Sequence, residues 1–157
     1  VAVNQKAKEV SSRIGMKRTV ETSPFYPAWV ESAKKDIQDI KAAIAAKDFI
    51  RLGEITEANG MKMHGTMLGA EPPFSYWEPD SIVAIKTAQT LRKQGISCYV
   101  TMDAGPNVKV LCRLSQAETI KQALLEHFTE DKLIITKPGK GIRELTAAER
   151  AVYNWND

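Results

Sequence analysis

The spacing of apolar residues predicts a chain of amphipathic helices around a short β-hairpin. From Ala28 onward, apolar residues recur every three or four positions and so share one face of a helix, namely Trp29, Ala33, Ile37, Ile40 and Ile44. A second helix is predicted from Asp48, which can cap it, to about Gly69. Gly53 and Gly60 within that segment weaken its helical preference.

Capping signals predict further helices before and after this pair. Ser11 or Ser12 can cap a helix that runs to about Glu21 and ends before Pro24 and Pro27. Three more helices are predicted: one from Asp80 or Ser81 to Gly95, one from the Ser115–Glu118 capping box to about Phe128, and one from the Thr146–Glu149 capping box through Val152 and Trp155.

Two β-prone runs, Cys98–Met102 and Val108–Arg113, are joined by a five-residue linker at 103–107, which predicts an antiparallel hairpin. Leu133–Thr136 is predicted to be a last strand, and Val1–Val3 resembles the end of a longer strand. The order of elements indicates a single α+β domain, in which an antiparallel sheet is covered by helices.

Composition excludes several classes of protein without selecting a function. A net charge of +3, from 22 basic and 19 acidic residues, is too balanced to indicate a nucleic-acid partner. Cys98 and Cys112 lie in apolar runs without metal-ligand spacing, so we expect buried free thiols and no metal site. No apolar run approaches the roughly 20 residues that span a bilayer, so we expect a cytoplasmic protein without membrane contact.

Two segments could carry chemistry, and each also has a purely structural explanation. Asp103 stands at a strand end before Gly105 and Pro106, where it is either an ordinary turn residue or a general base held by a rigid strand. The basic and hydroxyl-bearing residues of segment 8–13 suit a phosphate at a helix start, but they equally fit a helix cap beside a solvated face. His64, His127 and the aromatic loop 74–77 are expected to be structural or surface features.

Longer motifs around both segments resemble one family. Residues 8–16, KEVSSRIGM, followed by TVETS at 19–23, resemble the start of the C-terminal domain of mevalonate diphosphate decarboxylases. Residues 101–108, TMDAGPNV, resemble the catalytic loop of that family, and PPFSY at 72–76 lies between the two motifs. The resemblance implies a ferredoxin-like C-terminal domain of the galactokinase, homoserine kinase, mevalonate kinase and phosphomevalonate kinase (GHMP) superfamily.

The resemblance also implies a reaction and roles for particular residues. The expected activity is the decarboxylation of mevalonate 5-diphosphate to isopentenyl diphosphate with ATP and Mg²⁺, in the mevalonate pathway of isoprenoid biosynthesis. Asp103 would be the catalytic base for phosphorylation of the tertiary hydroxyl. Ser12 and Arg13 would bind the anionic groups of the substrate, and Lys8 would approach the phosphates of the nucleotide.

The family's glycine-rich phosphate loop is not found in these residues. We therefore expect a fragment that lacks an N-terminal nucleotide-binding domain and is inactive by itself. The family tends to form homodimers, so a homodimer is expected too. Two other possibilities are another small-molecule kinase of the same superfamily and a non-enzymatic module that binds RNA or protein.

Overall fold

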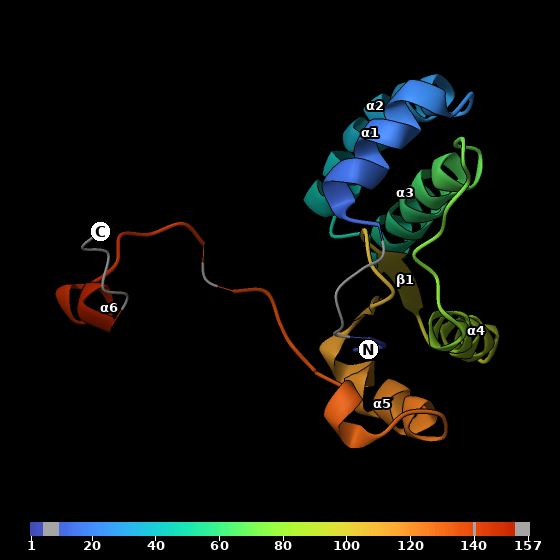
Figure 1. Cartoon of the computed structure of the whole chain (residues 1–157). Coiled ribbons are helices and arrows are strands. Elements are labelled where there is room, and N and C mark those ends of the chain that lie inside the picture. Colours follow the sequence, from blue (N-terminus) through green and yellow to red (C-terminus); the bar gives the residue numbers. More distant parts are fainter. Residues whose placement is uncertain (5–9, 140, 153–157) are drawn as a thin grey trace.

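The computed structural model describes residues 1–4, 10–139 and 141–152, and the statements below concern these residues. Figure 1 shows a body built from five helices and a hairpin, with α6 at the end of an extended segment away from it. The helices and strands are α1 (Ser12–Thr22), α2 (Tyr26–Ala45), α3 (Phe49–Leu68), α4 (Pro79–Lys93), β1 (Cys98–Met102), β2 (Val108–Cys112), α5 (Ala117–Leu125) and α6 (Ala147–Val152). Short 3₁₀ turns occupy Leu114–Gln116 and Glu130–Lys132.

The predicted α+β class and hairpin are confirmed. β1 and β2 pair antiparallel, with Cys98 opposite Cys112 and Met102 opposite Val108. Helices cover both faces of β1, because α3 packs on one side of the strand and α4 on the other. Figure 1 shows this order, with α1, α2 and α3 on one side of β1 and α4 and α5 on the other.

The two faces of β1 pack differently because successive side chains of a strand point in opposite directions. Its even-numbered positions join α4 and α5 in the main core, which contains Ala84, Ile85, Ala88, Leu91, Cys98, Val100, Met102, Ile120, Leu124 and Phe128. Its odd-numbered positions face α3, where Tyr99 lies directly against Gly53 and Thr101 lies close to Gly60. The glycines that weakened the helix prediction therefore allow α3 to approach the strand closely.

Most helix boundaries agree with the sequence predictions, and the exceptions have local causes. Ser11 and Asp48 cap α1 and α3 as expected, through Ile14 N–H and Arg51 N–H. Pro27 does not end a helix but lies in the first turn of α2, where a missing N–H costs nothing. The apolar stripe predicted for α2 is only partly covered, since Trp29, Ala33 and Ile40 are half-buried whereas Ile37 and Ile44 are 51% and 59% exposed.

Two other sequence predictions are wrong. The Ser115 capping box does not form, because residues 114–116 make a 3₁₀ turn and α5 begins only at Ala117, without a side-chain cap. Leu133–Thr136 is not a strand, since no described strand pairs with it, and Ile134 is 72% exposed. The Thr146–Glu149 capping box is confirmed, whereas Trp155 lies outside the described residues.

The N-terminal residues 1–3 lie beside the hairpin but do not form a strand, contrary to the sequence prediction. The amino group of Val1 donates to the carbonyl of Val108 at 2.7 Å, and Val108 N–H donates back to Val1 at 3.1 Å. Cys98 is buried and Cys112 is half-buried, both as free thiols, and burial raises the pKa of each. Within the described ranges, no helix is both long enough and apolar enough to cross a bilayer.

Candidate functional site

Asp103 follows β1 directly and lies in a turn whose backbone is held by hydrogen bonds. Gly105 N–H donates to the carbonyl of Asp103 at 2.8 Å, which closes the first part of the linker. The hydroxyl of Ser81, at the start of α4, donates to the carbonyl of Pro106 at 2.7 Å. Asn107 Oδ1 accepts the N–H groups of Val3 and Asn4. These contacts fix the linker at both ends, so the position of Asp103 is determined by backbone anchors.

The side chain of Asp103 is open to solvent, unlike the linker that carries it. It is 77% exposed and forms an ion pair with Lys109 across the hairpin. It also lines a hollow of about 310 Å³ between α2, α3 and the end of β1, together with Asp36, Asn59 and Thr101. Asp103 therefore lies on the α3 side of the hairpin, opposite the face of Cys98, Val100 and Met102, as the alternation predicted.

Ser12 and Arg13 form the first turn of α1. Ser11, the residue before them, accepts a hydrogen bond from Ile14 N–H with its hydroxyl and from Gly15 N–H with its carbonyl. Ser12 is half-buried and Arg13 is exposed, and among the described residues Arg13 has no ion-pair partner. A helix start with an unpaired guanidinium and a hydroxyl is suited to bind an anion. Lys8, the residue predicted to approach a nucleotide, lies outside the described residues.

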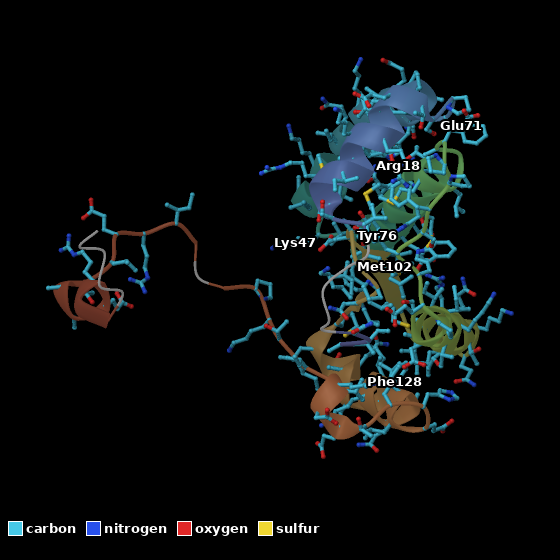
Figure 2. All side chains as sticks on the ribbon, in the orientation of Figure 1. Arg18, Lys47, Glu71, Tyr76, Met102 and Phe128 are labelled. Atoms are coloured by element: carbon cyan, nitrogen blue, oxygen red, sulfur yellow. The ribbon has the colours of Figure 1, made fainter. Side chains whose placement is uncertain are left out.

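The aromatic loop 74–77 joins the start of α1 to the rest of the body. Tyr76 donates from its hydroxyl to the carbonyl of Ser11, and Gly15 lies directly beneath the rings of Tyr76 and Phe74. The pKa of Tyr76 is raised by burial. In the view of Figure 2, Tyr76 lies in the middle part of the body. The loop thus packs onto α1, in agreement with the expectation that it is a structural feature.

Loop 74–77 also contacts His64 on α3. The sequence did not single out His64 as part of a site. Its ring lies 5.4 Å from that of Trp77, centroid to centroid. Burial lowers the pKa of His64, and the backbone of Met102 and the charge of Asp103 act in the opposite direction. Loop 74–77 therefore links the start of α1 to α3. No local pattern in the sequence predicts this link, because the residues that meet there are far apart along the chain.

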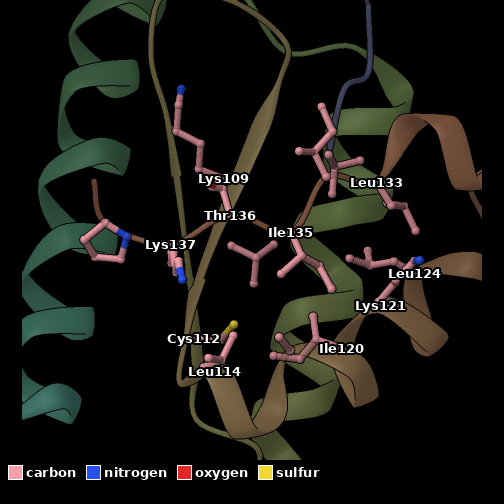
Figure 3. A pocket seen from close by; sticks show the side chains of 15 residues that line it. Lys109, Cys112, Leu114, Ile120, Lys121, Leu124, Leu133, Ile135, Thr136 and Lys137 are labelled. Atoms are coloured by element: carbon pink, nitrogen blue, oxygen red, sulfur yellow. The ribbon is translucent and has the colours of Figure 1, made fainter. Parts of the chain in front are cut away.

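A second hollow, of about 290 Å³, lies between β2, α5 and segment 133–138 (Figure 3). Its lining is mainly apolar, with Ile120, Leu124 and Ile135 in its wall and Lys109, Lys121 and Lys137 among its polar residues. Asp103, Ser12 and Arg13 do not line it. These three predicted site residues therefore lie outside this hollow.

The helix-covered antiparallel hairpin defines an α+β domain that is consistent with the GHMP superfamily. Residues 1–153 match the family described as "Mevalonate 5-diphosphate decarboxylase C-terminal domain". The chain belongs to this family.

Individual relatives agree with this assignment. The diphosphomevalonate decarboxylase of Saccharomyces cerevisiae is 32% identical over 76% of this chain and 31% of its own length. A solved structure of the mevalonate diphosphate decarboxylase from Enterococcus faecalis is 56% identical, with a TM-score of 0.77 over 79% of this chain and 39% of that one. Another, of MDDEF in complex with MVAPP, AMPPCP and magnesium, is 55% identical, with a TM-score of 0.81 over 84% and 40% of the two chains. The chain spans less than half the length of these relatives.

Proposed function

We propose that this chain is the C-terminal part of an enzyme that decarboxylates mevalonate 5-diphosphate to isopentenyl diphosphate, with conversion of ATP to ADP and phosphate. The observation that carries the proposal is Asp103, an exposed carboxylate on an anchored turn in a domain of the decarboxylase family. The relatives' names supply the reaction, and structures with mevalonate diphosphate and ATP binding in their descriptions support the substrates.

Asp103 would be the general base for phosphorylation of the tertiary hydroxyl. Its carboxylate would accept the hydroxyl proton as the alcohol oxygen attacks the γ-phosphate. A carboxylate is a weak base for an alcohol, so proton transfer would be late and coupled to bond formation. Loss of the new phosphate would then draw electrons from the substrate and release carbon dioxide. The anchored turn supports this role because phosphoryl transfer depends chiefly on positioning.

Ser12 and Arg13 would bind the anionic groups of the substrate, and Lys8 would approach the nucleotide phosphates. The guanidinium of Arg13, which has no ion-pair partner among the described residues, and the N-terminus of α1 support the first assignment. ATP and Mg²⁺ are the implied cofactors, and AMPPCP with magnesium in a related structure supports them. The described residues contain no group of three or more His, Cys, Asp or Glu side chains suited to a metal ion. Because the chain spans less than half the length of its relatives, we place nucleotide and metal binding mainly in an N-terminal domain and expect the chain alone to be inactive.

The proposed enzyme would be a cytoplasmic homodimer that binds neither nucleic acid nor membrane. These assignments follow from the family resemblance and from the balanced charge of the sequence.

The test is ATP-dependent release of carbon dioxide from carboxyl-labelled mevalonate 5-diphosphate by the full-length protein that carries this chain. Asp103→Asn should lower kcat at least about 100-fold with little change in KM, because it removes a group needed only in the transition state. Near-normal turnover of this variant would refute the role of Asp103. Phosphorylation without carbon dioxide release would indicate a different kinase of the superfamily. Measurable release by the isolated chain would contradict its expected inactivity.

A further inference from the structure

Cys98 and Cys112 lie directly opposite each other at the open end of the hairpin. The hydrogen bonds of neighbouring residues show which kind of cross-strand pair they form. In β1, the N–H of Val100 and the carbonyl of Cys98 bond to side chains on the edge that does not pair with β2. In β2, the N–H of Val108 likewise donates to Val1, away from β1. Backbone groups alternate in direction along a strand, so Cys98 and Cys112 form a narrow pair without hydrogen bonds between their backbones.

The spacing of such a pair suits a disulfide. Opposite residues of a narrow pair have Cα atoms about 4.5 Å apart, and a disulfide spans roughly 4.4–6.8 Å. Both side chains lie on the same face, since Cys98 belongs to the main core and Cys112 packs against that core. The Cys98 thiol donates to the carbonyl of Ala88 at 3.3 Å, and a thiol is a weak donor, so little is lost when it turns toward Cys112. The two sulfur atoms can therefore be joined while the strands keep their register.

The two thiols differ in their access to solvent. Cys98 is fully buried, whereas Cys112 is half-buried and lines the hollow of about 290 Å³ between β2, α5 and segment 133–138. In Figure 3, Cys112 lies near Leu114 and Ile120 in the wall of this hollow. A small molecule in the hollow can thus reach Cys112 directly, whereas Cys98 is reached from its cross-strand partner.

We propose that Cys98 and Cys112 form a thiol modification site, in which Cys112 reacts with a small disulfide such as oxidised glutathione and Cys98 then closes a cross-strand disulfide. In the first step, the Cys112 thiolate attacks one sulfur of the oxidant, which breaks its S–S bond and releases one glutathione. In the second step, the Cys98 thiolate attacks the Cys112 sulfur and releases the second glutathione. The two thiol protons pass to the two glutathione thiolates, and two electrons from the protein reduce the oxidant. The site does not depend on the reaction proposed for Asp103.

Peptide mapping of the full-length protein after incubation with oxidised glutathione tests this site. Trypsin cleaves after Lys93, Lys109 and Arg113, so the two cysteines fall on separate peptides, 94–109 and 110–113. Mass spectrometry should find these peptides joined in about half of the protein or more, and separate after reduction.

The rate of this reaction should depend strongly on pH. Burial raises the pKa of both Cys98 and Cys112, and the thiolate is the reactive form. The initial rate should therefore be low near pH 7 and rise about 10-fold or more at pH 9.

Three variants separate the two steps. Cys98→Ala should stop at the glutathione adduct on Cys112. Cys112→Ala should leave Cys98 as a free thiol, because the accessible sulfur is missing. The matched control combines Cys112→Ala with Leu111→Cys, which moves the thiol by one position to the opposite face of β2. This control should give no peptides joined through Cys98.

The inference is overturned if the native protein yields no joined peptides under conditions that oxidise the urea-unfolded protein. It is also overturned if Cys98 reacts with oxidised glutathione as fast in Cys112→Ala as in the wild type, or if the Leu111→Cys control gives joined peptides in equal yield. Mapping of the wild type needs no substitution, so it decides the question even where a variant does not fold.

Discussion

The carboxylate of Glu57 on α3 accepts a hydrogen bond from the backbone N–H of Val100 at 2.8 Å, on the edge of β1 that does not pair with β2. The same carboxylate accepts two hydrogen bonds from the guanidinium of Arg92 on α4, at 2.7 and 3.1 Å. Arg92 in turn donates to the carbonyl of Cys98. Glu57 and Arg92 therefore form hydrogen bonds with backbone groups on the edge of β1 that does not pair with β2. They also join the helices on the two sides of the strand.

Replacement of Glu57 by Ala should be strongly destabilising. It leaves the Val100 N–H and the partly buried Arg92 charge without their acceptor, which costs about 2–4 kcal/mol. Urea unfolding of the purified protein measures this loss. Glu31→Ala is the control, because its pair with Lys34 is about 70% exposed on both sides and is worth at most about 0.5 kcal/mol. Equal effects of the two substitutions would contradict the role of Glu57.

Two glycines of α3 should respond oppositely to substitution by Ala. A Cβ at Gly53 would lie 1.9 Å from the ring of Tyr99, so Gly53→Ala should cost about 1–3 kcal/mol through overpacking. A Cβ at Gly65 meets no described atom within 4 Å, so Gly65→Ala should add about 0.5–1 kcal/mol through helix propensity. Thermal unfolding of both variants checks the difference. A Gly53→Ala protein as stable as Gly65→Ala would show that α3 can move away from β1.

Stability should depend on pH through His64. Burial lowers its folded pKa below the unfolded value of 6.5, while the Met102 backbone and the Asp103 charge only partly oppose this effect. As pH falls through about 6.5, His64 becomes protonated to a greater extent in the unfolded chain than in the folded chain. The free energy of unfolding therefore decreases on the acid side. His64→Phe should show a flatter profile between pH 7.5 and 5.5 when unfolding free energies are measured in urea. Parallel profiles for the two proteins would exclude His64 as the source.

Arg13→Met should weaken substrate binding in the full-length protein. Loss of a charge-assisted hydrogen bond to a phosphate costs about 1.5–3 kcal/mol, which corresponds to a KM for mevalonate 5-diphosphate raised roughly 10- to 150-fold. Steady-state kinetics of carbon dioxide release measure this change. Lys17→Met, one turn further along α1, is the control, because its pair with Glu21 is 3.9 Å long and exposed. A KM raised equally by both variants would indicate a general charge effect.

The sequence by itself determined the local structure and the family. Helical spacing and the caps at Ser11 and Asp48 predicted α1 and α3 because these signals depend on neighbours within one or two turns. The hairpin was predicted for the same reason, since alternation and a turn-forming linker are local properties. Motifs around Ser12 and Asp103 indicated the decarboxylase family, and the comparisons confirmed it.

Tertiary structure decided what depends on residues distant along the chain. Leu133–Thr136 has strand-forming residues, but a strand needs a neighbour to pair with, and the described residues supply none for it. Glu57 and Val100 are 43 positions apart, so no local pattern connects them. His64 gives the clearest case: its sequence neighbourhood suggested only a structural or surface histidine. The packing of the fold buries its ring against Trp77, because chain topology determines which side chains meet in the interior.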